Sequence, residues 1–172
     1  MKFKILVGGI STLLYATIVS ANIEGETSTL IFNGKITEAT CALATGSDNQ
    51  IVDMGNVASN TFRKTGDTSR PQAFSINLTD CDTDVAKTAA IAFSGDTAND
   101  NTLKISGDAG NVGIQILQDN TALMLDGSTL SSSQTLADGS NAMQFSARYI
   151  ALADEVKAGD ANATAHFTLY YD

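Results

Sequence analysis

The sequence predicts an all-β protein, built as an antiparallel β-sandwich. Short runs of alternating apolar and polar residues recur, as in Gln72–Leu78 and Val112–Gln118. Successive side chains of a strand point to opposite faces, so a period of two is typical of a strand with one buried face. Clusters of Gly, Asn, Asp and Ser separate these runs and favour turns. Helical periodicity is hard to find, and many short strands at this spacing indicate a sandwich.

The expected strands follow one another without a linker, a repeat or a domain boundary after Ala21. In chain order they are Leu30–Leu43 with a bend at Gly34, Gln50–Val57, Gln72–Leu78, Ala89–Ser94, Thr102–Ser106, Val112–Gln118, Thr121–Leu125, Met143–Leu152 and Ala163–Tyr171. We expect the inward side chains of these strands to form a single core.

The final strand has one apolar face along its whole length. Phe167, Leu169 and Tyr171 alternate with polar residues, and only Asp172 follows. An uncovered apolar edge promotes pairing with another chain. The segment ending in Leu30-Ile-Phe32 is a candidate for the strand that pairs there, so we expect the protein to join copies of itself.

The first 21 residues are predicted to be a cleaved signal peptide. Lys2 and Lys4 precede an apolar stretch, Ile5 to Val19, and Val19-Ser-Ala21 is a small-residue cleavage site. The alternative is an uncleaved anchor, but a membrane span needs roughly 20 apolar residues. Asn22–Asp172 would then be the exported chain, with the size of one ordinary domain.

The composition is acidic and argues against nucleic acid as a partner. The chain has 10 basic and 19 acidic residues and a net charge of −9. Loss of Lys2 and Lys4 with the signal peptide makes the exported chain more acidic still. Such a surface repels phosphate backbones and anionic lipid.

Two cysteines, Cys41 and Cys81, lie forty positions apart. In an oxidising compartment a disulfide between them is the default, and free thiols or metal ligands are the alternatives. Zinc sites draw on several Cys and His ligands. With one histidine and no CxxC spacing, we predict neither a metal site nor a cofactor.

No set of residues indicates an enzyme. Nucleophilic hydrolysis usually requires a histidine base, and the only histidine, His166, lies on the polar face of the final predicted strand. Carboxylates are plentiful but cluster in turn segments, so no pair has the placement that glycoside hydrolysis requires. We therefore predict a protein that is not an enzyme.

Several further segments, taken in order along the chain, form a specific set. Phe32-Asn-Gly34 precedes the first cysteine, and the second lies in Leu78-Thr-Asp-Cys-Asp-Thr83. Val112–Leu117, Leu125-Asp-Gly127 and Ala147-Arg-Tyr149 follow. The end of the chain is the most specific part, with a penultimate tyrosine and a glycine fourteenth from the end. Together and in this order, these segments resemble the structural pilins of type 1-like, chaperone–usher fimbriae.

The resemblance implies an incomplete immunoglobulin-like sandwich that lacks its seventh strand, which a neighbouring subunit supplies by donor-strand complementation. It divides the chain into the signal peptide 1–21, a donor-strand extension 22–34 and a pilin domain 35–172. The inward donor residues would be Ser28, Leu30 and Phe32. Counting further back places Glu24 and Glu26 inward, at a cost in desolvation. Either a bulge brings Ile23 and Gly25 inward, or pairing ends near Ser28.

The resemblance places the acceptor groove along the terminal strand, where a periplasmic chaperone binds first. The matching residues are Gly159, Phe167, Leu169, Tyr171 and Asp172, and basic chaperone residues would hold the Asp172 carboxylate. Neighbouring pilins, the chaperone and the outer-membrane usher are the implied partners, with membrane contact only through the usher.

The implied function is a shaft subunit that passes through the periplasm and polymerises into a surface fimbria used in adhesion. Two alternatives remain. One is a minor adaptor pilin of the same system. The other is a self-contained secreted sandwich that binds a glycan or a protein, which predicts a stable monomer.

Overall fold

A computed structural model describes residues 28–34 and 40–172. The predicted signal peptide, residues 22–27 of the predicted extension and residues 35–39 lie outside the described residues. The chain divides into two units, Met1–Ile36 and Thr37–Asp172. In the first unit, the described residues 28–34 form neither helix nor strand. The side chains of Leu30, Ile31 and Phe32 there are 79%, 78% and 88% exposed.

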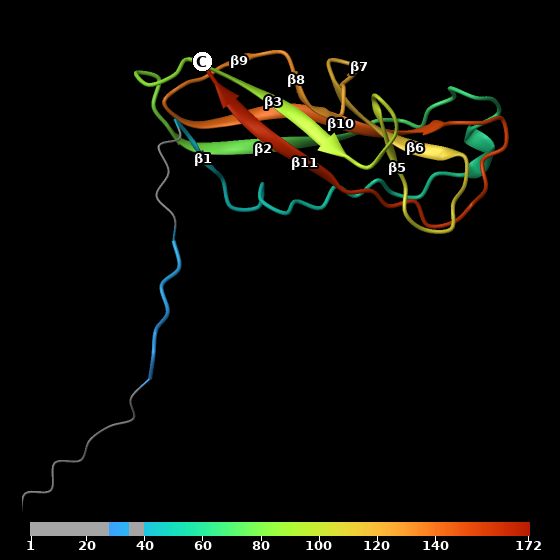
Figure 1. Cartoon of the computed structure of the whole chain (residues 1–172), viewed down its shortest axis with the longest axis horizontal. Coiled ribbons are helices and arrows are strands. Elements are labelled where there is room, and N and C mark those ends of the chain that lie inside the picture. Colours follow the sequence, from blue (N-terminus) through green and yellow to red (C-terminus); the bar gives the residue numbers. More distant parts are fainter. Residues whose placement is uncertain (1–27, 35–39) are drawn as a thin grey trace, which may run out of the picture. The chain divides into compact units, whose positions relative to one another are not determined.

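The second unit is all-β apart from one short 3₁₀ helix, Ser59–Thr61 (Figure 1). Its strands are β1 Ala42–Leu43, β2 Gln72–Cys81, β3 Thr88–Gly95, β4 Thr97–Asn99, β5 Thr102–Lys104, β6 Val112–Gln118, β7 Thr121–Ala122, β8 Asp126–Leu130, β9 Gln134–Thr135, β10 Gly139–Ala151 and β11 Ala165–Tyr171. The predicted fold class is confirmed. The described part of the chain contains no helix with the length and apolar character of a membrane span.

The strands form two antiparallel sheets. The larger has the order β1-β2-β10-β6-β5-β4, with β7 paired to β6. The smaller has the order β11-β3-β8, with β9 also paired to β3. Strands β2 and β10 have the most extensive pairing, from Asn141↔Leu78 to Ala147↔Gln72. In this arrangement β11 is an edge strand of the smaller sheet, which sets up the candidate site described below.

The core lies between the inward faces of the two sheets. Ile91 and Phe93 of β3 and Met143 and Phe145 of β10 are buried in one apolar cluster. Phe93 packs edge-on against Phe145, with ring centroids 5.2 Å apart. Each such side chain contributes about 1.5–3 kcal/mol when it is fully buried. The alternation that the sequence predicted for these strands therefore has its energetic basis in this core.

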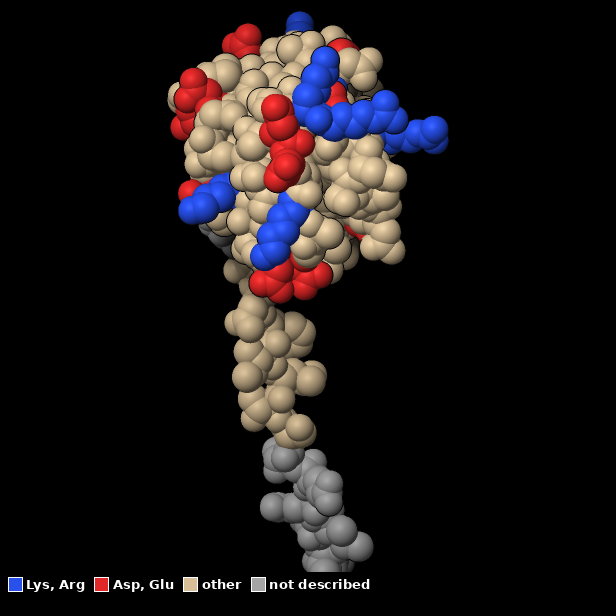
Figure 2. Space-filling model, turned by 90° about the vertical axis from the view of Figure 1, so that its right-hand side faces the viewer, with Lys and Arg blue, Asp and Glu red and all other residues tan. Residues whose placement is uncertain are grey.

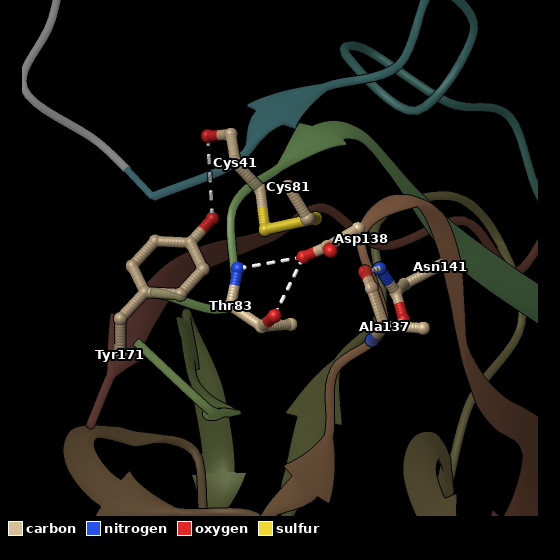
Figure 3. Close-up of a disulfide and its surroundings, with 7 residues drawn as sticks. All are labelled: Cys41, Cys81, Thr83, Ala137, Asp138, Asn141 and Tyr171. Atoms are coloured by element: carbon tan, nitrogen blue, oxygen red, sulfur yellow. Dashed lines mark hydrogen bonds between the residues drawn. A yellow bond between two sulfur atoms is a disulfide. The ribbon is translucent and has the colours of Figure 1, made fainter. Parts of the chain in front are cut away.

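Cys41 and Cys81 form the predicted disulfide, with their Cα atoms 4.1 Å apart (Figure 3). The bond joins the residue that precedes β1 to the last residue of β2. On a chain-entropy model, closing a loop of this length stabilises the fold by about 4 kcal/mol. Because β1 pairs with β2 over only two residues, the disulfide is a main restraint on this edge of the larger sheet.

Two predicted strands differ most from the structure, and a third, Thr121–Leu125, is shortened to Thr121–Ala122. Gln50–Val57 is not a strand, although Val52 and Met54 are half-buried and Ile51 is 91% exposed. Alternation alone does not make a strand, because a strand also needs a hydrogen-bonded neighbour, and no described strand pairs with this segment. Within the described residues, the predicted strand Leu30–Leu43 is reduced to Ala42–Leu43.

Three of the aspartates that fix local structure by hydrogen bonds in the second unit also have lowered pKa values. The Asp138 carboxylate accepts from the backbone N–H of Thr83 at 2.9 Å and from its hydroxyl at 2.6 Å (Figure 3). Asp154 does the same for Thr65, and Asp126 accepts from Ser128 and Thr129. Donors to the charged form hold the pKa of all three carboxyls below the ordinary aspartate value.

We predict that Asp138→Asn flattens the acid dependence of folding stability. A depressed pKa stabilises the fold above the unfolded-state value of about 4, and that stability is lost as pH falls through the folded-state pKa. The urea midpoint of the parent should therefore fall between pH 5 and pH 3 (about one unit on each side of that value) more steeply than the midpoint of the variant. Asp100→Asn, an exposed aspartate with no such side-chain contact in the structure, is the control. Equal slopes for the parent and Asp138→Asn would contradict the prediction.

Candidate functional site at the edge of β11

The candidate site is the β11 edge, defined here by the inward side chains of Ala165, Phe167, Leu169 and Tyr171. These four are half-buried, while His166, Thr168 and Tyr170 between them are exposed. The predicted alternation of the terminal strand is thus present. The inward side chains pack against the main core cluster but remain partly accessible, so this side of the core is incompletely covered.

Strand β11 has one described hydrogen-bonded neighbour, β3. The register runs from Ala165↔Gly95 through Phe167↔Phe93 to Tyr171↔Ala89. On its other side, no described strand pairs with β11. A row of backbone N–H and C=O groups is therefore available to a further strand, which is the property that makes an edge strand a template for pairing.

Half-buried apolar side chains from the opposite sheet and its flanking segment pack against the same core. They are Leu43 of β1, Met54 of the unpaired segment and Phe74 of β2. Aromatic contacts connect Phe74 to the β11 edge across the core. Phe74 stacks on Phe145 at 5.9 Å, and Phe93 lies 6.3 Å from Phe167. The accessible apolar surface is thus continuous with the core rather than an isolated patch.

The last residues of β11 are fixed to neighbouring segments. The Tyr171 hydroxyl donates to the Cys41 carbonyl oxygen at 3.5 Å (Figure 3), and burial raises the pKa of that hydroxyl above its usual value. The main-chain oxygen of Asp172 accepts from the backbone N–H of Lys87 at 2.8 Å and of Thr88 at 2.9 Å. These bonds hold the end of the strand against β3 and beside the disulfide.

Gly159 lies outside β11, in the connection from β10. A Cβ at Gly159 would come within 2.4 Å of the Ala109 nitrogen, and a Cβ at Gly107 within 2.3 Å of the Asp160 oxygen. The two segments meet in an irregular antiparallel ribbon, with bridges Ser106↔Asn162 and Gly110↔Lys157. The paired glycines let the two backbones approach closely.

The ribbon borders a pocket of about 280 Å³ next to the second, smaller core cluster. Phe62, Val112, Tyr149 and Gly159 are among its lining residues. Half-buried and exposed residues already alternate in the segment before β11, from Ala161 onward, and Ala161 also lines the pocket. The row of half-buried residues thus runs from Tyr171 through the β11 edge to the pocket.

The structure brings Phe167, Leu169 and Tyr171 together on one face and places Asp172 directly after them. Gly159 is part of the ribbon instead, which sequence reasoning did not foresee. The other side of the open core was also missed, because Leu43, Met54 and Phe74 come from three separate segments. Their only sequence signal is their alternation with polar or small neighbours. The predicted donor residues Ser28, Leu30 and Phe32 lie in the other unit and are exposed.

The charged residues do not form a patch of one sign on the face that Figure 2 shows. Lysine and arginine side chains lie among aspartates and glutamates there. Among the residues that the structure describes, no group of three or more His, Cys, Asp or Glu side chains is placed to hold a metal ion. The β11 edge offers free backbone groups for strand pairing and half-buried side chains for apolar contact.

Comparison with known sequences places this architecture in a family. A profile described as Fimbrial protein matches residues 30–172. The chain belongs to the fimbrial protein family. It is 39% identical over 186 residues to the fimbrial subunit type 1 of Salmonella typhimurium, with all of both chains covered. It is 42% identical over 151 residues to the type-1 fimbrial protein A chain of Escherichia coli K12, covering 83% of this chain and 82% of the relative.

Solved structures of pilus proteins have the same fold. A subunit of a chaperone-usher pilus superposes with a TM-score of 0.72 at 24% identity, covering 89% of this chain and 100% of that one. A type I fimbria protein of Burkholderia pseudomallei superposes with a TM-score of 0.59 at 36% identity, covering 78% and 91%. The chain is a structural subunit of a fimbria with the immunoglobulin-like pilin fold. Its family consists of surface-fimbria proteins that polymerise with other pilin subunits.

We predict that Gly159→Ala destabilises the second unit by about 1–3 kcal/mol, because the added methyl group meets backbone that cannot give way cheaply. Gly110→Ala in the same ribbon is the matched control, since its Cβ would lie at an ordinary 3.4 Å from the Lys157 side chain. Urea unfolding of both variants measures the difference. Equal free energies of unfolding would show that the close approach of the two backbones is not a constraint.

Proposed function

We propose that this pilin polymerises by donor-strand exchange, in which the extension 22–34 of one subunit pairs with the β11 edge of the next. The observation that carries the proposal is that β11 has one described hydrogen-bonded neighbour while its inward side chains remain half-buried. An added strand would supply backbone partners along the free side and cover the open core. This is β-strand addition, of which donor-strand complementation in chaperone–pilin complexes is a known example.

The exposed segment 28–34 has the composition that the added strand requires. Leu30 and Phe32 are 79% and 88% exposed, and they share one parity with Ser28. If the segment were inserted at the β11 edge, Leu30 and Phe32 would point toward the core and Ile31 would point away from it. Burying Leu30 and Phe32 would contribute on the order of 1.5–3 kcal/mol for each side chain. Backbone pairing would add a contribution that does not depend on sequence.

The unpaired segment 50–57 supports a position for the added strand between β11 and the larger sheet. The segment alternates between half-buried and exposed residues from Ile51 to Gly55, with Met54 packed on the core, but it has no described strand partner. A donor strand lying between β11 and this segment could pair with either. The predicted strand at Gln50–Val57 would then form only in the assembled subunit.

Before assembly, the same edge needs temporary cover, because an exposed apolar edge aggregates. We infer that a periplasmic chaperone lends a strand to the β11 edge after export, and that an outer-membrane usher exchanges it for the extension of the next subunit. The residues proposed to contact the chaperone strand are Phe167, Leu169 and Tyr171. Asp172 follows them and offers a carboxylate to basic groups.

We predict that Phe32→Ala and Leu30→Ala weaken polymer formation, whereas Ile31→Ala does not. All three residues are exposed in the described segment, but only the first two have inward parity. Removing a buried Leu or Phe side chain costs about 2–5 kcal/mol, which is a decrease in affinity of more than tenfold per contact. The measurement is the oligomer ladder of the mature protein on a denaturing gel without boiling.

Deletion of 22–34 is the reference for complete loss of the ladder. A ladder that survives this deletion would refute donor-strand joining, and so would equal losses for Ile31→Ala and Leu30→Ala. A stable and cooperatively folding monomer with the extension intact would favour a self-contained sandwich instead.

We also predict that Tyr171→Asp abolishes the complex with the chaperone, while Tyr170→Asp leaves it intact. Tyr171 is half-buried on the inward face, and Tyr170 is 43% exposed on the outward face. A carboxylate at position 171 would have to be buried without a partner when the lent strand covers the edge. Co-purification of each variant with the chaperone from periplasmic extract gives the measurement. Recovery of the Tyr171→Asp complex at the parental yield would contradict the proposed position of the edge.

A further inference from the structure

Asn33 and Gly34 form a dipeptide whose chemistry the proposed function does not use. Both residues are exposed, and segment 28–34 has no regular secondary structure. A Cβ built on Gly34 meets nothing within 4 Å. An asparagine followed by glycine is the sequence most prone to spontaneous cyclisation, because glycine offers no side chain to hinder attack by its backbone nitrogen and permits a wide range of backbone angles.

We propose that Asn33 is a site of spontaneous deamidation in the unassembled subunit, and that assembly protects it. The backbone nitrogen of Gly34 attacks Cγ of Asn33, forms a new C–N bond and gives a five-membered succinimide as ammonia leaves. Water then opens the ring at either carbonyl, which leaves aspartate or isoaspartate at position 33. The net reaction consumes one water and releases one ammonia, with no oxidation or reduction.

Two other dipeptides of this reactive type occur in the described chain, and the structure restrains both. Asp126-Gly127 has its carboxylate bonded to the backbone N–H groups of Ser128 and Thr129 at 2.7 Å. Asp138-Gly139 has its carboxylate bonded to the backbone N–H and hydroxyl of Thr83. These bonds hold each side chain in place. They also lower the pKa of both carboxyls, and an ionised carboxylate is a poor electrophile. Asn33 has no hydrogen bond to any described residue.

Protection on assembly follows from strand geometry and rests on the proposed function. Ring closure requires the Gly34 nitrogen to turn toward the Asn33 side chain, whereas a strand holds ψ near its extended value. An extension paired with the β11 edge would be held in that extended form up to Phe32 and its neighbours. The amide of Asn33 would thus report how long a subunit has remained unassembled.

The test compares the mature full chain before and after polymerisation in heavy-oxygen water at neutral pH. Peptide mapping by mass spectrometry scores the conversion of the Asn33 amide to an acid that carries solvent oxygen. An isoaspartate-specific methyltransferase identifies the rearranged product. We expect labelled acid at position 33 in the unassembled chain and several-fold slower labelling in the polymer. The variant Gly34→Ala should slow the reaction several-fold in the unassembled chain, because a methyl group then hinders the attacking nitrogen.

Absence of labelled acid at position 33 in the unassembled chain would overturn the modification site. Equal labelling in the polymer would overturn the protection. The rate in the unassembled chain does not depend on how subunits join. The labelling of the unassembled chain therefore tests the modification site alone. The deletion of 22–34 tests donor-strand joining alone, so the two proposals can fail separately.

Discussion

The backbone of β11 sets the main constraint on this molecule. The strand is hydrogen-bonded to β3 from Ala165 to Tyr171, and no other described strand pairs with it. Its inward side chains pack against the core. A rotation of the strand that hid its unpaired backbone groups would therefore expose Phe167 and Leu169. Water can satisfy the free N–H and C=O groups, but it cannot cover the apolar side chains beside them. The domain therefore keeps a half-open core.

The surrounding contacts fix both ends of this edge. At one end, the main chain of Asp172 bonds to Lys87 and Thr88, and Tyr171 reaches the Cys41 carbonyl. At the other end, Asn162 exchanges two backbone hydrogen bonds with Ser106. The disulfide and the glycine-lined ribbon thus act on opposite ends of the same strand. A rigid edge loses little conformational entropy when a partner strand binds, which favours tight pairing.

The sequence predicted the features that depend on periodicity and compartment. Phe167, Leu169 and Tyr171 share a face because strands have a period of two, and Cys41 and Cys81 pair as expected for an exported chain. Periodicity gave a wrong prediction where strand formation depends on a hydrogen-bonded neighbour. Gln50–Val57 alternates like a strand, but no described strand pairs with it. The short strands β8 and β9 escaped prediction because Asp126-Gly-Ser-Thr129 and Gln134-Thr135 have the composition of turns. The position of Gly159 follows from a contact with Asp108 and Ala109, about fifty residues earlier in the chain, and no local pattern encodes such a contact.

The charge of the chain limits what can drive its assembly. Copies with a net charge of −9 or below repel one another at long range, and Figure 2 shows charges of both signs mixed on the face that it displays. In the proposed donor-strand joining, attraction would come from short-range terms, namely backbone pairing and the burial of Leu30 and Phe32 against the half-open core. Both terms would act only after a strand is seated in register. Long-range repulsion and short-range strand pairing would together restrict joining to subunits whose donor strand is placed correctly.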